Sequence, residues 1–176
     1  MKPTDPQPVK LFIAALFSDD PLLQKSLGLC EQQFGAIDYR SERFPFDVTD
    51  YYAEEMGAPI YRQFASFTPL ADPGRLAAMK VRTNAIEDSI SEKGARKVNL
   101  DIGYMDFHKV VLASAKFNGQ KIYLDQGIYA DPTLYYRKGA FHPYDWSFPD
   151  FKSSDRYYNA LLEIRRIYKD QLGHTG

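Results

Sequence analysis

Hydrophobic and polar residues alternate along this chain in blocks that predict strands and amphipathic helices in turn. Residues 10–17 (KLFIAALF) are apolar almost without a break, which is typical of a central strand covered on both faces. Asp19 and Pro21 predict the start of a helix, because an acid caps the free amides of a first turn and proline fits there. Apolar residues then recur at spacings of three and four until Gly35, which ends the helix.

The same patterns return over the next seventy residues. Strands are predicted over 37–46, 61–67 and 97–105, a short helix over 50–56, and a long helix from Asp72-Pro73 to Gly94. The order strand, helix, two strands, helix, strand is that of the ferredoxin-like βαββαβ unit. We therefore expect an α+β fold in which an antiparallel or mixed sheet carries both long helices on one face.

Beyond Met105 the pattern changes to short strands joined by turns. Strand-like runs cover residues 109–117, 120–125 and 133–137. Asn118-Gly119 is a strong signal for a two-residue hairpin turn, and Lys138-Gly139 marks another turn. We expect a C-terminal β-meander from this arrangement. A last helix is predicted to begin at Ser153 or Asp155 and to end before Gly173.

Length and composition bound the class of protein. A chain of 176 residues with 44% apolar and 26% charged residues fits one soluble domain. We place that domain at residues 9–172, between a flexible N-terminal tail (1–8) and a C-terminal tail (173–176). No apolar run is long enough to cross a bilayer and the start lacks signal-peptide features, so we expect a cytoplasmic protein that does not bind membranes. The single Cys30 is expected to be a buried small hydrophobe.

The net charge of −1 hides an uneven distribution along the chain. Residues 1–74 hold 6 basic and 11 acidic side chains (−5), whereas residues 75–138 hold 11 basic and 7 acidic ones (+4). A solvated face explains the basic middle segment, and a surface for an anionic ligand is the alternative. Duplex nucleic acid is not an expected partner, because the bias is small and no recognition module is present.

Standard nucleotide and catalytic motifs are missing from the sequence. The chain has no G-x-x-x-x-G-K-[ST] phosphate loop, no G-x-G-x-x-G after its first strand and no G-x-S-x-G elbow. His108, His142 and His174 lack the spacing of zinc ligands. The sequence therefore names no cofactor, no metal and no reaction, and it leaves the oligomeric state open.

Two sets of polar residues are nevertheless candidates for a site. Asn99 and Asp101 alternate with apolar neighbours, so a strand through them presents both on one face, although an ordinary solvent-facing strand side has the same pattern. Lys80, Asn84 and Glu87 fall on one face of the long helix. Their alternative interpretation is a helix-surface network worth only a few tenths of a kcal/mol.

A third candidate set lies in the segment YLDQGIYADP. Asp125, Tyr129 and Asp131 surround Gly127, where a tight bend would bring two carboxylates together. Aspartate is also common in turns because of its local hydrogen bonds, so a turn is the alternative interpretation. An aromatic cluster further along is expected to cover the core rather than to stack on bases; it consists of Tyr144, Trp146, Phe148 and Phe151.

Six sequence blocks look like those of a known family. They are, in chain order, FPFDVTDYYAEEMG, KVRTNAIE, VNLDIGY, KVVLASAK, KIYLDQGIYADPTLYYRKGAF and WSFPDF. In these blocks the chain resembles the bacterial domain of unknown function family 4416 over residues 9–172. The resemblance implies no reaction, since none is established for the family. The GTP-binding label that some members carry finds no phosphate loop in this chain.

Two positions depart from the family pattern. Ile102 precedes Gly103 where the family has proline, and Asp131 stands where the family has glutamate. The shorter acid keeps its charge but withdraws it by one methylene. We therefore expect no role at this position that needs the full reach of glutamate.

These residues together predict a polar pocket on the sheet. Its members are Asn99, Asp101, Lys116, Asp125, Tyr129, Asp131 and Arg137, joined by Lys80, Asn84 and Glu87 from the helix. We hypothesise that the pocket binds a small anionic ligand, phosphorylated or a nucleotide. Lys116 and Arg137 would hold the anion, Arg as a bidentate fork and Lys as a point charge.

Two alternative functions stay open at this point. One is a metal-assisted hydrolase in which a bound ion activates water, using Asp101, Asp125 and Asp131. The other is a non-catalytic protein–protein interaction module with an exposed apolar patch of Tyr51, Tyr52, Trp146 and Phe148.

Overall fold

The computed structural model describes residues 1–91, 95–152 and 155–173. Its strands are β1 (Val9–Phe17), β2 (Ile37–Arg40), β3 (Phe44–Pro45), β4 (Tyr61–Ala71), β5 (Val98–Met105), β6 (Lys109–Ser114), β7 (Ile122–Asp125), β8 (Ile128–Arg137) and β9 (Ala140–Pro143). Its helices are α1 (Asp20–Phe34), α2 (Ala53–Met56), α3 (Leu76–Ile90), α4 (Pro149–Lys152) and α5 (Tyr158–Gly173), with single 3-10 turns η1 (Pro73–Arg75) and η2 (Asp155–Tyr157).

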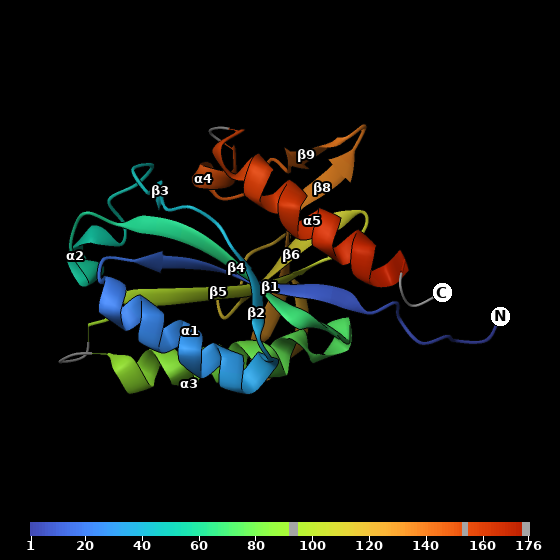
Figure 1. Cartoon of the computed structure of the whole chain (residues 1–176), viewed down its shortest axis with the longest axis horizontal. Coiled ribbons are helices and arrows are strands. Elements are labelled where there is room, and N and C mark those ends of the chain that lie inside the picture. The colour runs from blue at the N-terminus through green and yellow to red at the C-terminus, as the bar shows by residue number, and fades with distance from the viewer. Residues whose placement is uncertain (92–94, 153–154, 174–176) are drawn as a thin grey trace.

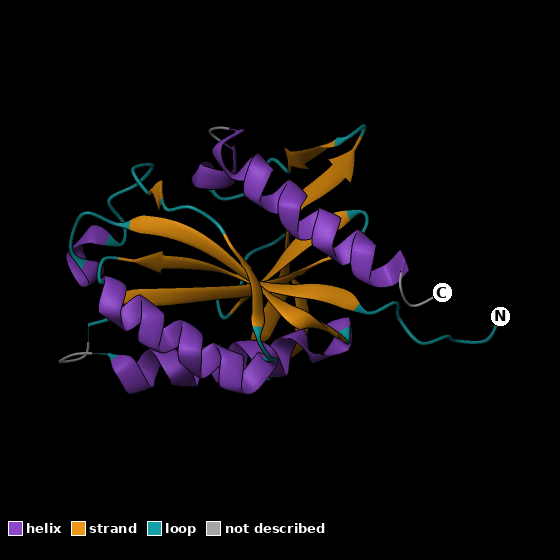
Figure 2. Ribbon diagram, viewed as in Figure 1, coloured by secondary structure: helices purple, strands orange, loops and turns teal. Residues whose placement is uncertain are grey.

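The described strands form one open sheet in which all neighbouring pairs are antiparallel (Figure 2). The order is β2-β4-β1-β5-β6-β8-β7, with β3 beside β4 and β9 beside β8. Strand β8 pairs with β6 along one edge. Strands β7 and β9 also pair with β8, each with a different part of it. The α+β class and the antiparallel sheet that the sequence predicted are confirmed.

Helices cover both faces of the sheet (Figure 1). Successive side chains of β1 point to opposite faces of the sheet. Leu11 and Ile13 pack with α1 and α3 on one face, and Phe12 and Ala14 pack with α5 on the other. No polar face is left on β1, since every residue from Val9 to Phe17 is buried. Both long helices that follow β1 and β4 therefore share one face, and the last helix closes the other.

The first helix begins and ends where the sequence predicts. The Asp19 carboxylate accepts a hydrogen bond from the backbone amide of Leu22 at 2.8 Å and so caps α1. Gly35 follows the helix with φ 96°, and a Cβ atom there would lie 2.5 Å from Cγ of Pro69. Glycine is required at this end for both its conformation and its size.

The prediction of one continuous strand over residues 37–46 is wrong. It is divided into β2 and β3, which pair with different parts of β4. Between them the Ser41 hydroxyl accepts a hydrogen bond from the backbone amide of Phe64 at 2.9 Å, which replaces one ladder bond. Strand β4 also runs four residues beyond the predicted end at Phe67.

The predicted hairpin at Asn118-Gly119 and the β-meander are also wrong. Strands β6 and β7 do not pair with each other, because β8 lies between them. Neither Asn118 nor Gly119 adopts the positive φ of a two-residue hairpin turn. That conformation is found instead at Gln126-Gly127, with φ 53° and 75°, and at the predicted turn Lys138-Gly139, with φ 53° and 85°.

The remaining expectations concern termini and helix ends. Gly94, Ser153 and His174 lie outside the described residues, and α3 is described to Ile90.

Cys30 is fully buried on α1, as expected, and burial raises the pKa of its thiol to about 12. No helix in the described ranges is both long and apolar enough to span a bilayer.

Candidate functional site

A cleft of about 590 Å³ opens where strands β5 and β6 part. The two strands pair from Gly103 opposite Leu112 to Met105 opposite Val110. The earlier residues of β5 have β1 on one side, and on the other side no strand among the described residues. The cleft is lined by Tyr51, Tyr52, Lys80, Asn84, Glu87, Asp88, Arg96, Asn99, Asp101, Ala113, Ser114, Ala115, Lys116, Lys121 and Phe148. An unpaired strand edge inside a fold needs other hydrogen-bond partners, and helix α3 supplies them.

Two charged side chains of α3 bind the free edge of β5. The Glu87 carboxylate accepts a hydrogen bond from the backbone amide of Leu100 at 2.7 Å, and the Lys80 ammonium donates to the carbonyl of Leu100 at 3.0 Å. Lys80 Nζ and Glu87 Oε1 are 3.7 Å apart, and both side chains are buried. Burial raises the pKa of Glu87, and the charge of Lys80 opposes that rise. The alternative interpretation of Lys80 and Glu87 as part of an exposed network on the helix surface is therefore wrong.

A buried arginine connects the cleft to a second buried carboxylate, that of Asp150. Arg62, on β4, is 2% exposed, and its Nε atom lies 2.6 Å from the carboxylate of Asp150, which is 1% exposed. Its Nη1 atom donates to the carbonyl of Ala14 at 3.0 Å and lies 3.5 Å from the carboxylate of Asp101. Burial works against the positive charge, but the two carboxylates outweigh it and raise the pKa of Arg62.

The charged chain continues from Asp101 along the cleft. Asn99 donates to the Asp101 carboxylate at 2.8 Å and accepts from Arg96 at 3.1 Å. Arg96 binds both carboxylate oxygens of Glu55, at 2.8 and 3.0 Å, and reaches Glu87 at 3.2 Å. Acids and bases are thus held in fixed positions by one another, with Asp101 at the centre and 27% exposed.

Two lysines of the β6–β7 connection form the outer wall. Lys121 donates to the hydroxyl of Ser114 at 2.9 Å and lies 3.4 Å from the carboxylate of Asp131. The ammonium group of Lys116 contacts Tyr51, whose hydroxyl lies 2.8 Å from Nζ and whose ring lies beneath the ammonium at 5.0 Å. No carboxylate of the described residues forms an ion pair with Lys116.

Aromatic rings complete the cleft on the side of α2. Tyr51 is 64% exposed and Phe148 is 40% exposed. Behind them, Phe46 stacks with Phe148 and contacts the edge of Tyr52. Burial raises the pKa of Tyr52 to about 12, and the nearby Asp101 carboxylate adds to the rise. The cleft therefore combines an apolar, ring-lined wall with a cationic wall.

Most of the predicted site residues meet at this cleft. Six of the ten line it directly: Lys80, Asn84, Glu87, Asn99, Asp101 and Lys116. Asp131 is connected to the cleft through its ion pair with Lys121, and burial raises the pKa of the Asp131 carboxyl group.

The other three predicted residues lie elsewhere. Asp125 is exposed and accepts a hydrogen bond from the backbone amide of Gln126 at 2.8 Å, so it stabilises the β7–β8 turn. Tyr129 contacts the rings of Phe117 and Tyr123. Arg137 ends β8, six residues from Asp131, and at about 3.3 Å per residue this distance is on the order of 20 Å.

Six charged cleft or network residues were missed in the sequence: Glu55, Arg62, Asp88, Arg96, Lys121 and Asp150. Arg62 carries a detectable signal, because it is a charged residue within a strand that is otherwise uncharged. Asp150 lies in the short helix α4 and Arg96 in the connection between α3 and β5; neither carries a signal, since the positions of both segments depend on the tertiary structure.

The structure does not support a three-carboxylate metal site. Among residues 1–91, 95–152 and 155–173, no three His, Cys, Asp or Glu side chains are grouped so as to hold a metal ion. Asp125, at its turn, is outside the cleft that Asp101 lines. The proposed hydrolytic set of Asp101, Asp125 and Asp131 therefore lacks the geometry it requires.

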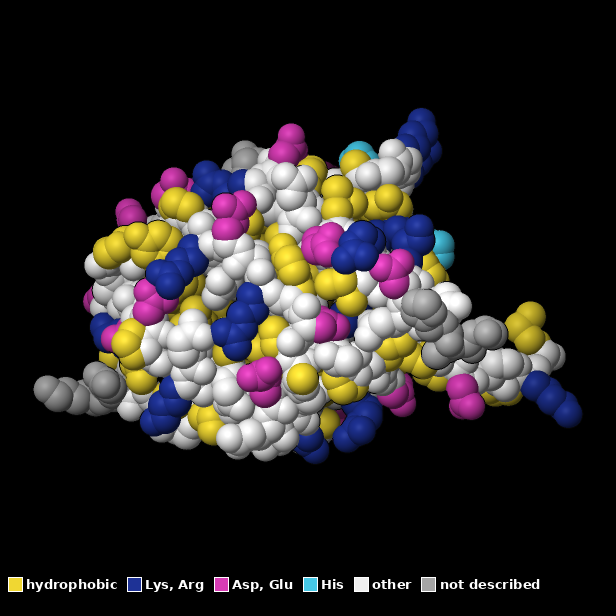
Figure 3. Space-filling model, viewed as in Figure 1, with side chains coloured by type: hydrophobic (Ala, Val, Ile, Leu, Met, Phe, Trp, Pro, Cys, Tyr) yellow, Lys and Arg dark blue, Asp and Glu magenta, His cyan; other side chains and the backbone are white. Residues whose placement is uncertain are grey.

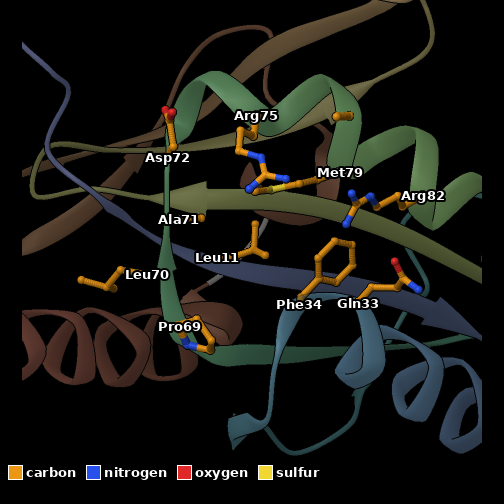
Figure 4. Close-up of a pocket in the computed structure, with 11 residues that line it drawn as sticks. Leu11, Gln33, Phe34, Pro69, Leu70, Ala71, Asp72, Arg75, Met79 and Arg82 are labelled. Atoms are coloured by element: carbon orange, nitrogen blue, oxygen red, sulfur yellow. The ribbon is translucent and has the colours of Figure 1, made fainter.

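A second, smaller pocket of about 190 Å³ lies beside η1 and the start of α3 (Figure 4). The side chains of Arg75, Met79 and Arg82 extend over Leu11 and Phe34. Ligand pockets for drug-sized molecules usually measure about 300–1,000 Å³, so the cleft is the better candidate. On the molecular face drawn in Figure 3, basic and acidic side chains are interspersed without a large patch of one sign.

The fold and cleft define an α+β protein whose open antiparallel sheet has a charged, partly aromatic opening between two of its central strands. The sequence model of the family described as "Domain of unknown function (DUF4416)" matches residues 7–168. The chain belongs to this family. Neither a curated protein nor a solved structure matches it.

Proposed function

We propose that the cleft binds a small anionic ligand that carries a ring, with nucleoside phosphates as the best-fitting class. The observation that carries this proposal is the position of Lys116. Its ammonium group lies at the cleft on the ring of Tyr51, and it forms no ion pair with a carboxylate of the described residues, although Glu55 interacts with its charge at longer range. A lysine held in this way is available to an incoming phosphate.

The aromatic wall supports the choice of a ring-bearing ligand. Tyr51 and Phe148 expose much of their surfaces on the cleft. Stacking of a base on an aromatic side chain contributes about 1–3 kcal/mol and tolerates different bases. The volume of about 590 Å³ also falls within the usual range for small-molecule sites.

The fixed acids support a role in orienting hydroxyl groups. Asp101 is partly exposed and is held by Asn99 and Arg62. Carboxylates accept hydrogen bonds from sugar hydroxyls, as in dinucleotide sites where an acid binds a ribose. The Arg96 guanidinium already forms ion pairs with Glu55 and Glu87. We therefore assign Arg96 to positioning these carboxylates and not to binding the anion.

The anion-binding pair differs from the one expected from the sequence. Arg137 is replaced in this proposal by Lys121, which lines the cleft and shares its charge with Asp131. The alternative of a protein–protein interaction module loses part of its basis, because Tyr51, Tyr52 and Phe148 form the wall of the cleft.

We also infer a ferredoxin-like unit in residues 9–105; the order β2-β4-β1-β5 supports it.

The test is a ligand screen followed by a matched pair of variants. Nucleoside mono-, di- and triphosphates and sugar phosphates are screened by thermal shift, since a ligand that binds only the native state raises its apparent stability. The best compound is then titrated calorimetrically into wild type, Lys116→Met and Arg137→Met. We expect Lys116→Met to weaken binding by roughly tenfold or more, because a charge-assisted hydrogen bond contributes about 1.5–3 kcal/mol.

Arg137→Met is the control, because it removes one exposed cation far from the cleft. Equal affinities of wild type and Lys116→Met for the same compound would contradict the assignment. The absence of any thermal shift across the panel at millimolar concentration would contradict the proposed ligand class.

A further inference from the structure

The smaller pocket, beside η1 and the start of α3, has an apolar floor beneath two cations (Figure 4). Leu11 and Phe34 form the floor and are 3% and 9% exposed. The side chains of Arg75 and Arg82 extend over it, with Met79 between them in the chain. The pocket therefore offers an apolar contact surface and two guanidinium groups at the same opening.

The two guanidinium groups are not used by the fold. Arg75 and Arg82 are exposed, and neither side chain makes a hydrogen bond, an ion pair or a ring contact with a residue that the structure describes. Other exposed arginines do find a partner, since Arg43 binds Asp20 and Arg166 binds Glu163. An arginine without a protein partner keeps its five N–H donors available to an anion.

Asp72 is the one acidic residue in the lining of this pocket within the described part of the chain. Its carboxylate accepts a hydrogen bond from the backbone amide of Gly74 at 2.8 Å and so caps η1. Figure 4 shows this carboxylate directed away from both guanidinium groups. The positive charge over the floor is therefore left for a ligand.

We propose that the smaller pocket binds a small carboxylic acid with a compact apolar group, in the size range of a branched chain of about four carbons. The apolar group would lie on Leu11 and Phe34, and the carboxylate would accept hydrogen bonds from Arg75 and Arg82. The volume of about 190 Å³ fits this class, because an apolar cavity of about 150 Å³ holds a benzene molecule. The planar fork of arginine matches a carboxylate group.

The inference is independent of the proposed nucleotide site. No residue that lines the smaller pocket also lines the cleft. A failure of either ligand class would therefore leave the test of the other unaffected.

The first test is a titration with 4-methylpentanoate, followed through the backbone amide signals in NMR spectra. We expect the amides of Gln33, Arg75 and Met79 to shift with a Kd on the order of 1 mM, since ligands of so few atoms bind weakly. Acetate keeps the charge without the apolar group, and 4-methylpentan-1-ol keeps the apolar group without the charge. Each should bind at least about fivefold more weakly. Equal binding of either compound, or no shift of these amides at about 20 mM acid, would overturn the proposal.

The second test removes the two cations in the double variant Arg75→Gln, Arg82→Gln. Binding of 4-methylpentanoate should weaken by at least about tenfold, because two charge-assisted hydrogen-bonding groups are lost. Thermal unfolding should stay at the wild-type temperature, since neither side chain has a described partner. Met79→Glu places a carboxylate between the two arginines on the helix and should weaken binding by internal competition.

The control is Arg137→Gln, which removes an exposed cation at the end of β8. Its affinity for 4-methylpentanoate should equal that of the wild type. Wild-type affinity in the double variant, or an equal loss in Arg137→Gln, would show that the acid does not bind through Arg75 and Arg82.

Discussion

At the scale of single residues, the buried charges of this protein are each matched by an opposite charge or a backbone group. Lys80 and Glu87 lie seven positions apart on α3 and jointly bind the amide and carbonyl of Leu100. A buried ion pair contributes little net stability, since desolvation offsets the attraction, but the loss of one partner leaves a costly uncompensated charge. The pair therefore fixes where β5 lies relative to α3.

This coupling can be measured with a double-mutant cycle. Glu87→Gln keeps an acceptor for the amide of Leu100 but removes the charge that faces Lys80, so we expect the free energy of unfolding to fall by about 3–5 kcal/mol. Lys80→Met in the same chain should recover part of that loss. The measurement is urea denaturation of the wild type, both single variants and the double variant.

The control for the cycle is an exposed ion pair on α5. Arg166 and Glu163 form a surface pair at 2.6 Å, and a cycle on it should be close to additive, because solvent screens an exposed pair. If the Lys80–Glu87 cycle is strictly additive, the two side chains act independently and the positioning role is wrong.

At the scale of elements, the cleft exists because β5 and β6 pair over only three residues. Gly103 is the first of these residues on β5, and it lies opposite Leu112. A Cβ atom at Gly103 would lie 2.4 Å from the carbonyl oxygen of Val111 and 2.7 Å from Cδ2 of Leu112. Glycine thus permits a close backbone approach at the point where the two strands begin to separate.

Gly103→Ala should therefore destabilise the protein by about 1–3 kcal/mol, because the added methyl group forces β6 to move. Thermal unfolding followed by circular dichroism measures the loss. Gly119→Ala is the matched control, since nothing lies within 4 Å of a Cβ atom at that position. Equal stabilities of the two variants would mean that β6 adapts without cost.

At the scale of the whole molecule, α5 supplies much of the cover on one face of the sheet. Leu161, Ile164 and Tyr168 of this helix are 0% exposed and pack with or beside the core that contains Phe12 and Leu134. Each buried side chain of this size contributes about 1.5–3 kcal/mol. These contributions are a large share of the 5–15 kcal/mol that is the usual stability of a domain.

Removal of residues 158–176 should therefore abolish cooperative unfolding and expose apolar surface to a hydrophobic dye. Removal of residues 1–5 is the control, because these residues are exposed and precede β1. A truncated chain that still unfolds in a single cooperative transition would show that the core on the α1 and α3 side is sufficient by itself.

The sequence by itself determined the local elements, because their causes are local. The cap at Asp19, the glycine after α1 and the unbroken apolar run of β1 each act within a few residues. The class of fold followed from the order of these elements. The sequence also indicated the charged residues of β5 and α3, since charge within strand-forming or helix-stripe sequence needs a partner.

Only the tertiary structure decided which of those residues meet. A turn signal at Asn118-Gly119 cannot choose between neighbouring strands, and the pairing of β8 with both β6 and β7 overrides it. The splitting of β5 from β6 brings α3, β5 and the β6–β7 connection together, and it leaves Arg137 at the far end of β8. Strand partners and their register depend on buried contacts between distant segments, which no short stretch of the chain contains.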